Sequence, residues 1–199
     1  MTLAHRLPIL AAIALSLAAC GGPPATRYLI EAAPASDQAP VRLRVRSIEL
    51  RDVVLPAYGE GSQILREGSA GALVPIAGAE WADGSSSAIT AELARRLDLR
   101  SSATVAAEPW PLADPADLRL ELRLTSVVAR ADGRFQLAGQ FAAASMDGRA
   151  REFIERIDIS VPMAGQPDDG RSEAAVIADA YGRALEALAE AMLARLARR

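Results

Sequence analysis

The chain has 199 residues, of which 51% are hydrophobic and 24% are charged, and its formal net charge at pH 7 is −3. This balance is typical of a globular protein and excludes a largely disordered chain. The acidic net charge argues against a nucleic-acid partner, because proteins that bind nucleic acids present a basic surface to the phosphates.

The first 19 residues have the features of a lipoprotein signal peptide. Arg6 precedes an apolar run over residues 7–19, which is too short for a membrane span of about 20 residues. The run ends in the lipobox Leu17-Ala18-Ala19-Cys20, whose small residues suit cleavage by a peptidase. We expect residues 1–19 to be removed. Cys20 would then carry a diacylglycerol and an N-acyl chain, which together give stable anchoring.

Cys20 is the only cysteine of the chain, so it has no partner for an internal disulfide. Gly21 follows it, in place of the Asp that commonly holds lipoproteins at the inner membrane. We therefore expect the protein at the outer membrane of a Gram-negative envelope, on the periplasmic face. Residues 20–26 would form a lipidated tether of about 20 Å when fully extended, and residues 27–199 a single domain.

The residue types that most catalysis uses are missing from the predicted domain. The chain has no lysine, and its only histidine, His5, lies in the signal peptide. Common nucleophile–histidine pairs and zinc sites are thereby excluded. A carboxylate-only enzyme stays open, but the nearest acidic pair, Asp168-Asp169, is better explained by a loop with a helix cap. We expect a non-enzymatic protein with no metal, and no cofactor besides the lipid on Cys20.

The first half of the domain predicts strands and one helix. Residues 27–31 and 41–50 are expected strands, and the second alternates apolar residues with Arg42, Arg44 and Arg46. These arginines form either a solvated sheet face or a patch for anionic lipids. Residues 62–66 and 72–76 predict a hairpin. Residues 85–99 predict a helix with a buried stripe of Ile89, Leu93 and Leu97, and residues 104–107 a short strand.

The second half predicts three long strands and a final helix. The strands cover residues 117–130, 134–146 and 149–161, and Asp-Gly pairs in the two links favour tight hairpins. The final helix, over residues 172–196, has an apolar stripe formed by Ile177, Tyr181, Leu185, Leu188, Met192 and Leu196. We expect an α+β fold, with a mixed, mainly antiparallel sheet and two amphipathic helices packed on one face.

Five residues are candidates for contact with a partner. Tyr58, Gln63 and Ile64 form either a contact loop or a loop ordered only for folding. Trp81 precedes the first helix and is either a binding anchor or a buried staple against that helix, the second being favoured. Trp110 lies between two prolines and either is an exposed docking residue or covers one end of the core.

The order of these features resembles a known family. A lipobox is followed by Tyr28-Leu29-Ile30, by Leu55-Pro56-Ala57-Tyr58 before Gln63-Ile64-Leu65-Arg66, by Trp81 ahead of a helix, and by a terminal helix. This order is similar to that of the ABC-type transport auxiliary lipoprotein family, of the paraquat-inducible PqiC (YmbA-like) type. The resemblance extends over essentially the whole predicted domain.

The resemblance implies a non-enzymatic lipoprotein subunit of a lipid transport system. Its partner would be an MCE-domain protein that crosses the periplasm, served indirectly by an ABC transporter, and the family resemblance also allows a homo-oligomeric ring. Two loops depart from the family pattern, at residues 59–62 and 82–85. If these loops touch the partner, the cognate MCE protein is expected to differ from the best-known one. The alternative is a lipid-binding carrier, which requires an apolar cavity between sheet and helices.

Overall fold

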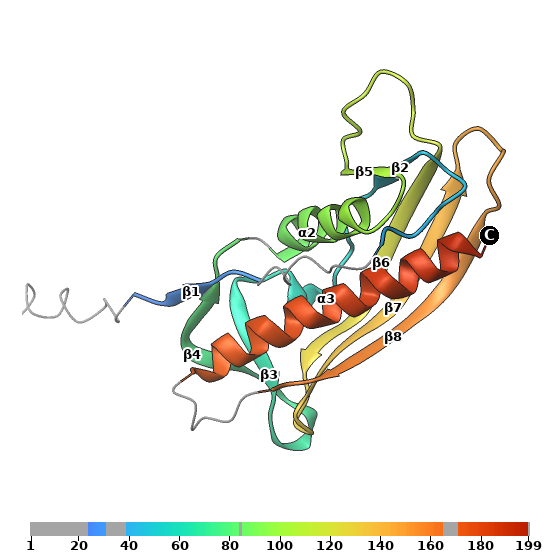
Figure 1. Cartoon of the computed structure of the whole chain (residues 1–199). Helices are drawn as coiled ribbons and strands as arrows, with labels where there is room; N and C mark the ends of the chain where they lie inside the picture. The colour runs from blue at the N-terminus through green and yellow to red at the C-terminus, as the bar shows by residue number, and fades with distance from the viewer. Residues whose placement is uncertain (1–23, 31–38, 84, 165–170, 199) are drawn as a thin grey trace, which may run out of the picture.

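Figure 1 shows the computed structural model, which describes residues 24–30, 39–83, 85–164 and 171–198. The predicted signal peptide, Cys20 and the pair Asp168-Asp169 lie outside these residues. Within the described residues, an eight-stranded mixed sheet carries two long helices on one face. The predicted α+β class and helix placement are therefore confirmed.

The strands of the sheet occur in a mixed order. They are β1 (Thr26–Tyr28), β2 (Ser47–Leu50), β3 (Gln63–Glu67), β4 (Leu73–Trp81), β5 (Thr104–Ala107), β6 (Leu118–Ala129), β7 (Arg134–Ser145) and β8 (Phe153–Pro162). One path through the sheet is β1-β4-β3-β6-β2-β5, and β7 and β8 extend from the other edge of β6. The predicted β3–β4 hairpin and β6–β7–β8 meander are antiparallel, whereas β1–β4, β2–β5, β2–β6 and β3–β6 are parallel.

Both helices form where the apolar periodicity predicts them. Helix α2 covers Ser85–Leu99, and helix α3 covers Glu173–Ala197 after the N-cap Ser172, whose hydroxyl accepts a hydrogen bond from the Ala175 N–H. Every residue of the two predicted stripes is buried. The stripes pack on the leucines of β6 and the apolar residues of β7 in one continuous core, which fixes how the helices lie across the sheet in Figure 1.

The predicted strand over residues 41–50 is wrong in its first six residues. Only Ser47–Leu50 form regular strand, although exposure alternates along residues 41–46 as predicted. The reason is that backbone N–H groups of this segment donate to side-chain oxygens and not to the carbonyls of a neighbouring strand. The Leu43 N–H donates to Ser102 Oγ at 3.0 Å, and the Arg46 N–H donates to Asp117 Oδ2 at 2.7 Å. The segment therefore pairs through its backbone only at its ends, where Val41 forms an isolated bridge with Ser101 and the Arg46 carbonyl accepts from the Thr104 N–H at 2.9 Å.

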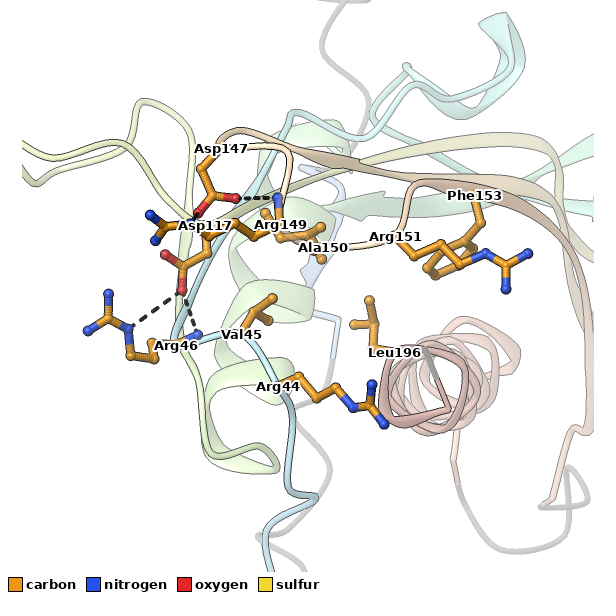
Figure 2. A pocket seen from close by; sticks show the side chains of 11 residues that line it. Arg44, Val45, Arg46, Asp117, Asp147, Arg149, Ala150, Arg151, Phe153 and Leu196 are labelled. Carbon is orange, nitrogen blue, oxygen red and sulfur yellow. Dashed lines mark hydrogen bonds and ion pairs between the residues drawn. The ribbon is translucent and has the colours of Figure 1, made fainter.

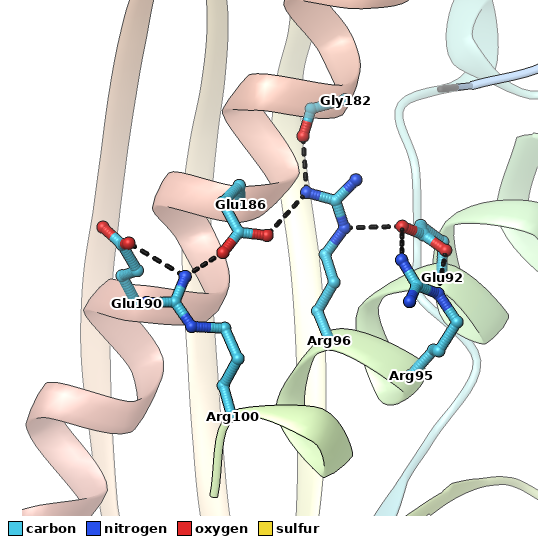
Figure 3. Close-up of polar contacts among 7 residues, drawn as sticks. All are labelled: Glu92, Arg95, Arg96, Arg100, Gly182, Glu186 and Glu190. Carbon is cyan, nitrogen blue, oxygen red and sulfur yellow. Dashed lines mark hydrogen bonds and ion pairs between the residues drawn. The ribbon is translucent and has the colours of Figure 1, made fainter. Parts of the chain in front are cut away.

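A buried polar network connects the two helices (Figure 3). The Arg96 side chain is only 2% exposed, and its Nη1 donates to the Gly182 carbonyl at 2.6 Å and to Glu186 Oε2 at 3.0 Å. Its Nε donates to Glu92 Oε1 at 2.7 Å. Arg100 also pairs with Glu186. Because guanidinium donors reach across from α2 to α3, the network specifies one arrangement of the two helices in addition to their apolar contact.

Candidate functional site

Three of the predicted contact residues lie together at one end of the sheet. Tyr58, in the short 3₁₀-helix Ala57–Gly59, lines a small pocket of about 30 Å³ with Gln63 and Trp81. The Trp81 N–H donates to the Ser62 carbonyl at 2.6 Å, which holds the end of β4 beside the start of β3. Sequence proximity does not bring Trp81 to Tyr58; the β3–β4 pairing does.

Most of this cluster packs against residues of the hydrophobic core. The Trp81 ring meets Tyr181 of α3 edge to face, with 5.7 Å between ring centroids, and Phe135 of β7 stacks on Tyr181 at 4.7 Å. Tyr58 is half-buried, and its hydroxyl accepts a hydrogen bond from the Val127 N–H at 3.1 Å. The Gln63 side chain is exposed. The accessible surface here is therefore the side chain of Gln63 and the outer edges of Tyr58 and Trp81.

Tyr181 is the member of this cluster that sequence reasoning placed only in the core. Its hydroxyl is buried and has no hydrogen-bond partner among the described residues. Burial, and then the nearby Tyr58 and Glu60, raise the pKa of Tyr181 above its usual value, so the phenol stays neutral. The adjoining pocket has room for about one water molecule, which would satisfy the hydroxyl. The pocket is too small for a partner's side chain.

The other two candidates lie elsewhere. Ile64 is fully buried in the core, so its side chain is not on the surface that a partner could meet, whereas the preceding Gln63 is exposed. Trp110 lies in the long connection between β5 and β6, where its Nε1 donates to the Asp114 carbonyl at 2.8 Å. That half-buried indole orders its own loop and is not part of the Tyr58 cluster.

The cluster lies next to the point where the chain enters the fold. Strand β1 pairs with β4 in the register Tyr28↔Trp81, and the Ala82 N–H donates to the Tyr28 carbonyl at 2.8 Å. The Tyr28 hydroxyl is 2.8 Å from Ser172 Oγ, at the start of α3. The predicted tether ends at Thr26, so this end of the domain is the one nearest to Cys20 along the chain.

The centre of the space between the helices and the sheet is filled, whereas an open pocket of about 860 Å³ lies at its edge beside the start of α3, where Ala129, Met163 and Ile177 supply apolar lining. Within the described residues, side chains of α2, α3, β6 and β7 form one continuous buried cluster, in which Leu120, Leu137 and Leu185 are fully inaccessible. A search of the same residues for a helix long and apolar enough to cross a membrane gave none. The arrangement offers surface for protein contacts, a core filled at its centre, and an open pocket at its edge.

Comparison with known families and structures places the chain. The family model of the ABC-type transport auxiliary lipoprotein component matches residues 28–193. The chain belongs to this family. The ABC-type transport auxiliary lipoproteins are, as their description says, accessory components of a transport system. The resemblance that the lipobox, Tyr28, Tyr58 and Trp81 indicated in the sequence is thereby confirmed.

Solved structures share the fold of this auxiliary lipoprotein. A DUF330 protein from Xanthomonas campestris aligns with a TM-score of 0.61 at 13% identity, over 84% of this chain and 92% of that one. The crystal structure of an uncharacterized protein aligns with a TM-score of 0.59 at 14% identity, over 81% and 98%. No similar sequence was found among the curated proteins.

Proposed function

We propose that this protein is a non-enzymatic, lipid-anchored subunit of the outer membrane that docks a periplasmic MCE-domain protein and so serves an ABC-type lipid transport system. The observation that carries the proposal is the family match over residues 28–193. The lipobox ending at Cys20 and the acidic, lysine-free composition are consistent with it. A homo-oligomeric ring remains a prediction from the family resemblance.

The arrangement of the domain supports an adaptor. The end nearest to Cys20 is closed by β1, by the aromatic cluster of Trp81 and Tyr181, and by the start of α3. The filled centre of the core supports an adaptor over the alternative of a lipid carrier, because a carrier must enclose acyl chains between sheet and helices, and the pocket beside the start of α3 is open and has Arg66, Glu67 and Glu173 in its lining. The protein would then hold a partner at the membrane without taking up the transported lipid.

The anchor is tested by Cys20→Ala. We expect this change to abolish metabolic palmitate labelling and to move the protein from the membrane fraction to the soluble periplasmic fraction, because the acyl chains supply the membrane affinity. Gly22→Ala, two residues further along the predicted tether, is the matched control and should leave labelling and fractionation unchanged. Palmitate labelling that persists in Cys20→Ala would contradict the proposed anchor.

The partner is tested by crosslinking from the accessible part of the aromatic cluster. A photo-crosslinking residue replaces the exposed Gln63 in cells, and we expect it to trap the MCE-domain protein. The same replacement at Gln140, an exposed glutamine of β7 on the face of the sheet away from the helices, is the control and should trap much less. Equal capture from Gln63 and Gln140 would count against a contact at this cluster. Capture of no MCE-domain protein from any surface would count against the proposed function.

A further inference from the structure

A pocket of about 330 Å³ (Figure 2) lies at the C-terminal end of α3, which is the end away from β1 in Figure 1. It is assembled from four segments that are far apart in the sequence. These are residues 44–46 before β2, the start of β6, the β7–β8 connection with the start of β8, and the last turns of α3. The pocket shares no residue with the Tyr58 cluster.

The pocket has an apolar floor and a cationic rim. Val45, Phe153 and Leu196 supply apolar surface, with Leu118 buried beneath them. Four exposed arginines surround this floor in Figure 2, namely Arg44, Arg46, Arg149 and Arg151. Only two carboxylates, those of Asp117 and Asp147, belong to the lining. The lining therefore carries more positive than negative charge, in a protein whose net charge is negative.

Both carboxylates are already engaged by local donors. Asp117 Oδ2 accepts from the Arg46 N–H at 2.7 Å and lies 3.9 Å from Arg46 Nε. Asp147 accepts from the Arg149 N–H at 2.9 Å, and its second oxygen lies 3.4 Å from Arg149 Nε. Within the described part of the chain, Arg44 and Arg151 form no ion pair. These two guanidinium groups are therefore the rim charges left to meet an external anion.

The pocket faces away from the predicted membrane anchor. Strand β1 contacts the start of α3 through Tyr28 and Ser172, whereas the pocket contains Leu196 from its other end. Helix α3 has 25 residues and is therefore about 37 Å long. The predicted tether reaches only about 20 Å. A domain that stands on its tether thus presents this pocket to the periplasm and not to the bilayer that holds Cys20.

We propose that this pocket docks an acidic segment of the partner protein, with one carboxylate at Arg44, another at Arg151, and an apolar side chain against Val45, Phe153 and Leu196. The inference rests on the proposed function and adds to it the chemistry and place of a second contact. Guanidinium groups bind carboxylates through paired donors, and an apolar floor beneath them selects an amphipathic segment. The position away from the anchoring bilayer favours a protein segment over a lipid headgroup.

The test measures binding of the full-length lipidated protein, in detergent, to the purified MCE-domain protein. We expect the double variant Arg44→Glu/Arg151→Glu to bind about tenfold more weakly or worse, because each change puts a like charge against the acidic segment. Binding by the unaltered protein should also weaken as salt is raised. The matched control is Arg42→Glu/Arg156→Glu, two exposed arginines outside the pocket lining, which should bind as the unaltered protein does.

The outcomes separate this proposal from the proposed function. If the pocket variant binds as tightly as the control, the docking pocket is wrong and the partner assignment stands. If the unaltered protein does not bind the MCE-domain protein, both are wrong. A second arm adds the Cys20→Ala chain to phosphatidylcholine vesicles that contain phosphatidylglycerol. Vesicle binding that requires Arg44 and Arg151 would also overturn the proposal, in favour of a lipid headgroup site. Circular dichroism verifies that each variant is folded.

Discussion

Gly139→Ala is expected to lower the free energy of unfolding by about 3 kcal/mol, at the upper end of the usual cost of overpacking. A Cβ at residue 139 would lie 2.1 Å from the Arg123 carbonyl oxygen and 2.8 Å from the Leu124 Cα. Both are backbone atoms of β6. No rotamer change relieves the overlap, so β6 and β7 would have to separate at this point.

The surroundings of Gly139 prevent an easy separation. Strand β6 has a bulge here, because Gly139 pairs with Leu124 and Ala138 pairs with Ser126, which leaves Thr125 as an extra residue. On the far side of β6, the Val54 N–H donates to the Leu122 carbonyl at 3.0 Å, and the Leu124 N–H donates to the Val54 carbonyl at 2.8 Å. Strand β6 is thus held from both sides where the new methyl group would push.

Urea unfolding of the Cys20→Ala chain, followed by far-ultraviolet circular dichroism, measures the effect of Gly139→Ala. The control is Gly61→Ala in the same background, where the nearest atom to a new Cβ is the Gln63 nitrogen at 4.0 Å. We expect the control to change the free energy of unfolding by no more than about 0.5 kcal/mol. Equal effects of the two changes would mean that the close approach of β6 to Gly139 does not exclude a side chain at residue 139.

The bulge also shows where sequence periodicity stops predicting the fold. Alternation correctly places Leu118, Leu120, Leu122 and Leu124 on the buried face of β6. Beyond the extra residue, Val127 and Ala129 oppose the buried Leu137 and Phe135, so the inward set changes from even to odd residues. A single strand pattern does not reveal such a shift, since it depends on the partner strand. The parallel pairings were likewise unpredictable, because they join strands that are distant in the sequence.

The candidate sites were predictable to different degrees. Composition and local motifs predicted the family and grouped Tyr58 with Gln63, because both flank one short loop. Whether Ile64 points inward depends on the residue at which β3 begins, and the preceding loop leaves that residue undefined in the sequence. The arginine-rimmed pocket was only partly visible. Arg44 and Arg46 stood out as same-face arginines, but Arg151 and Leu196 join them solely through the tertiary fold.

Taken together, the two ends of the domain carry different surfaces. The end beside β1 has aromatic rings packed into the core with Gln63 exposed beside them, and the other end presents arginines to solvent. The two proposed contacts with the MCE-domain protein therefore lie at different ends, one at Gln63 beside β1 and the other at the arginines around Leu196. The two helices that run between these ends are connected by Arg96.

Arg96→Ala is expected to lower the free energy of unfolding by about 3 kcal/mol, because it removes one partner from a buried, hydrogen-bonded set of charges. The change leaves the Gly182 carbonyl without its guanidinium donor and removes a contact from both Glu92 and Glu186 (Figure 3). Glu92 retains Arg95, and Glu186 retains Arg100, which keeps the loss at the lower end of the range for buried pairs.

Arg95→Ala provides the matched control for Arg96→Ala, since Arg95 is the next residue of α2 and pairs with the same Glu92. Its side chain is 42% exposed, and its interactions in Figure 3 run to Glu92. We expect a loss of about 0.5 kcal/mol, as for other solvent-exposed helix pairs. If Arg95→Ala destabilises the protein as much as Arg96→Ala, the contacts of Arg96 with α3 do not account for the stability that the network adds.

The pH dependence of unfolding separates the electrostatic part of this loss from packing. Burial raises the pKa of Glu92, but hydrogen bonds from Arg95 and Arg96 and their charges outweigh it, so that the pKa lies below its usual value of 4.5. The pairing therefore stabilises the fold above that value and is lost as the pH falls below it. Urea unfolding at a series of acidic pH values should show a shallower loss of stability in Arg96→Ala than in the unaltered chain. An identical pH dependence in both would assign the whole effect to packing of the Arg96 side chain between α2 and α3.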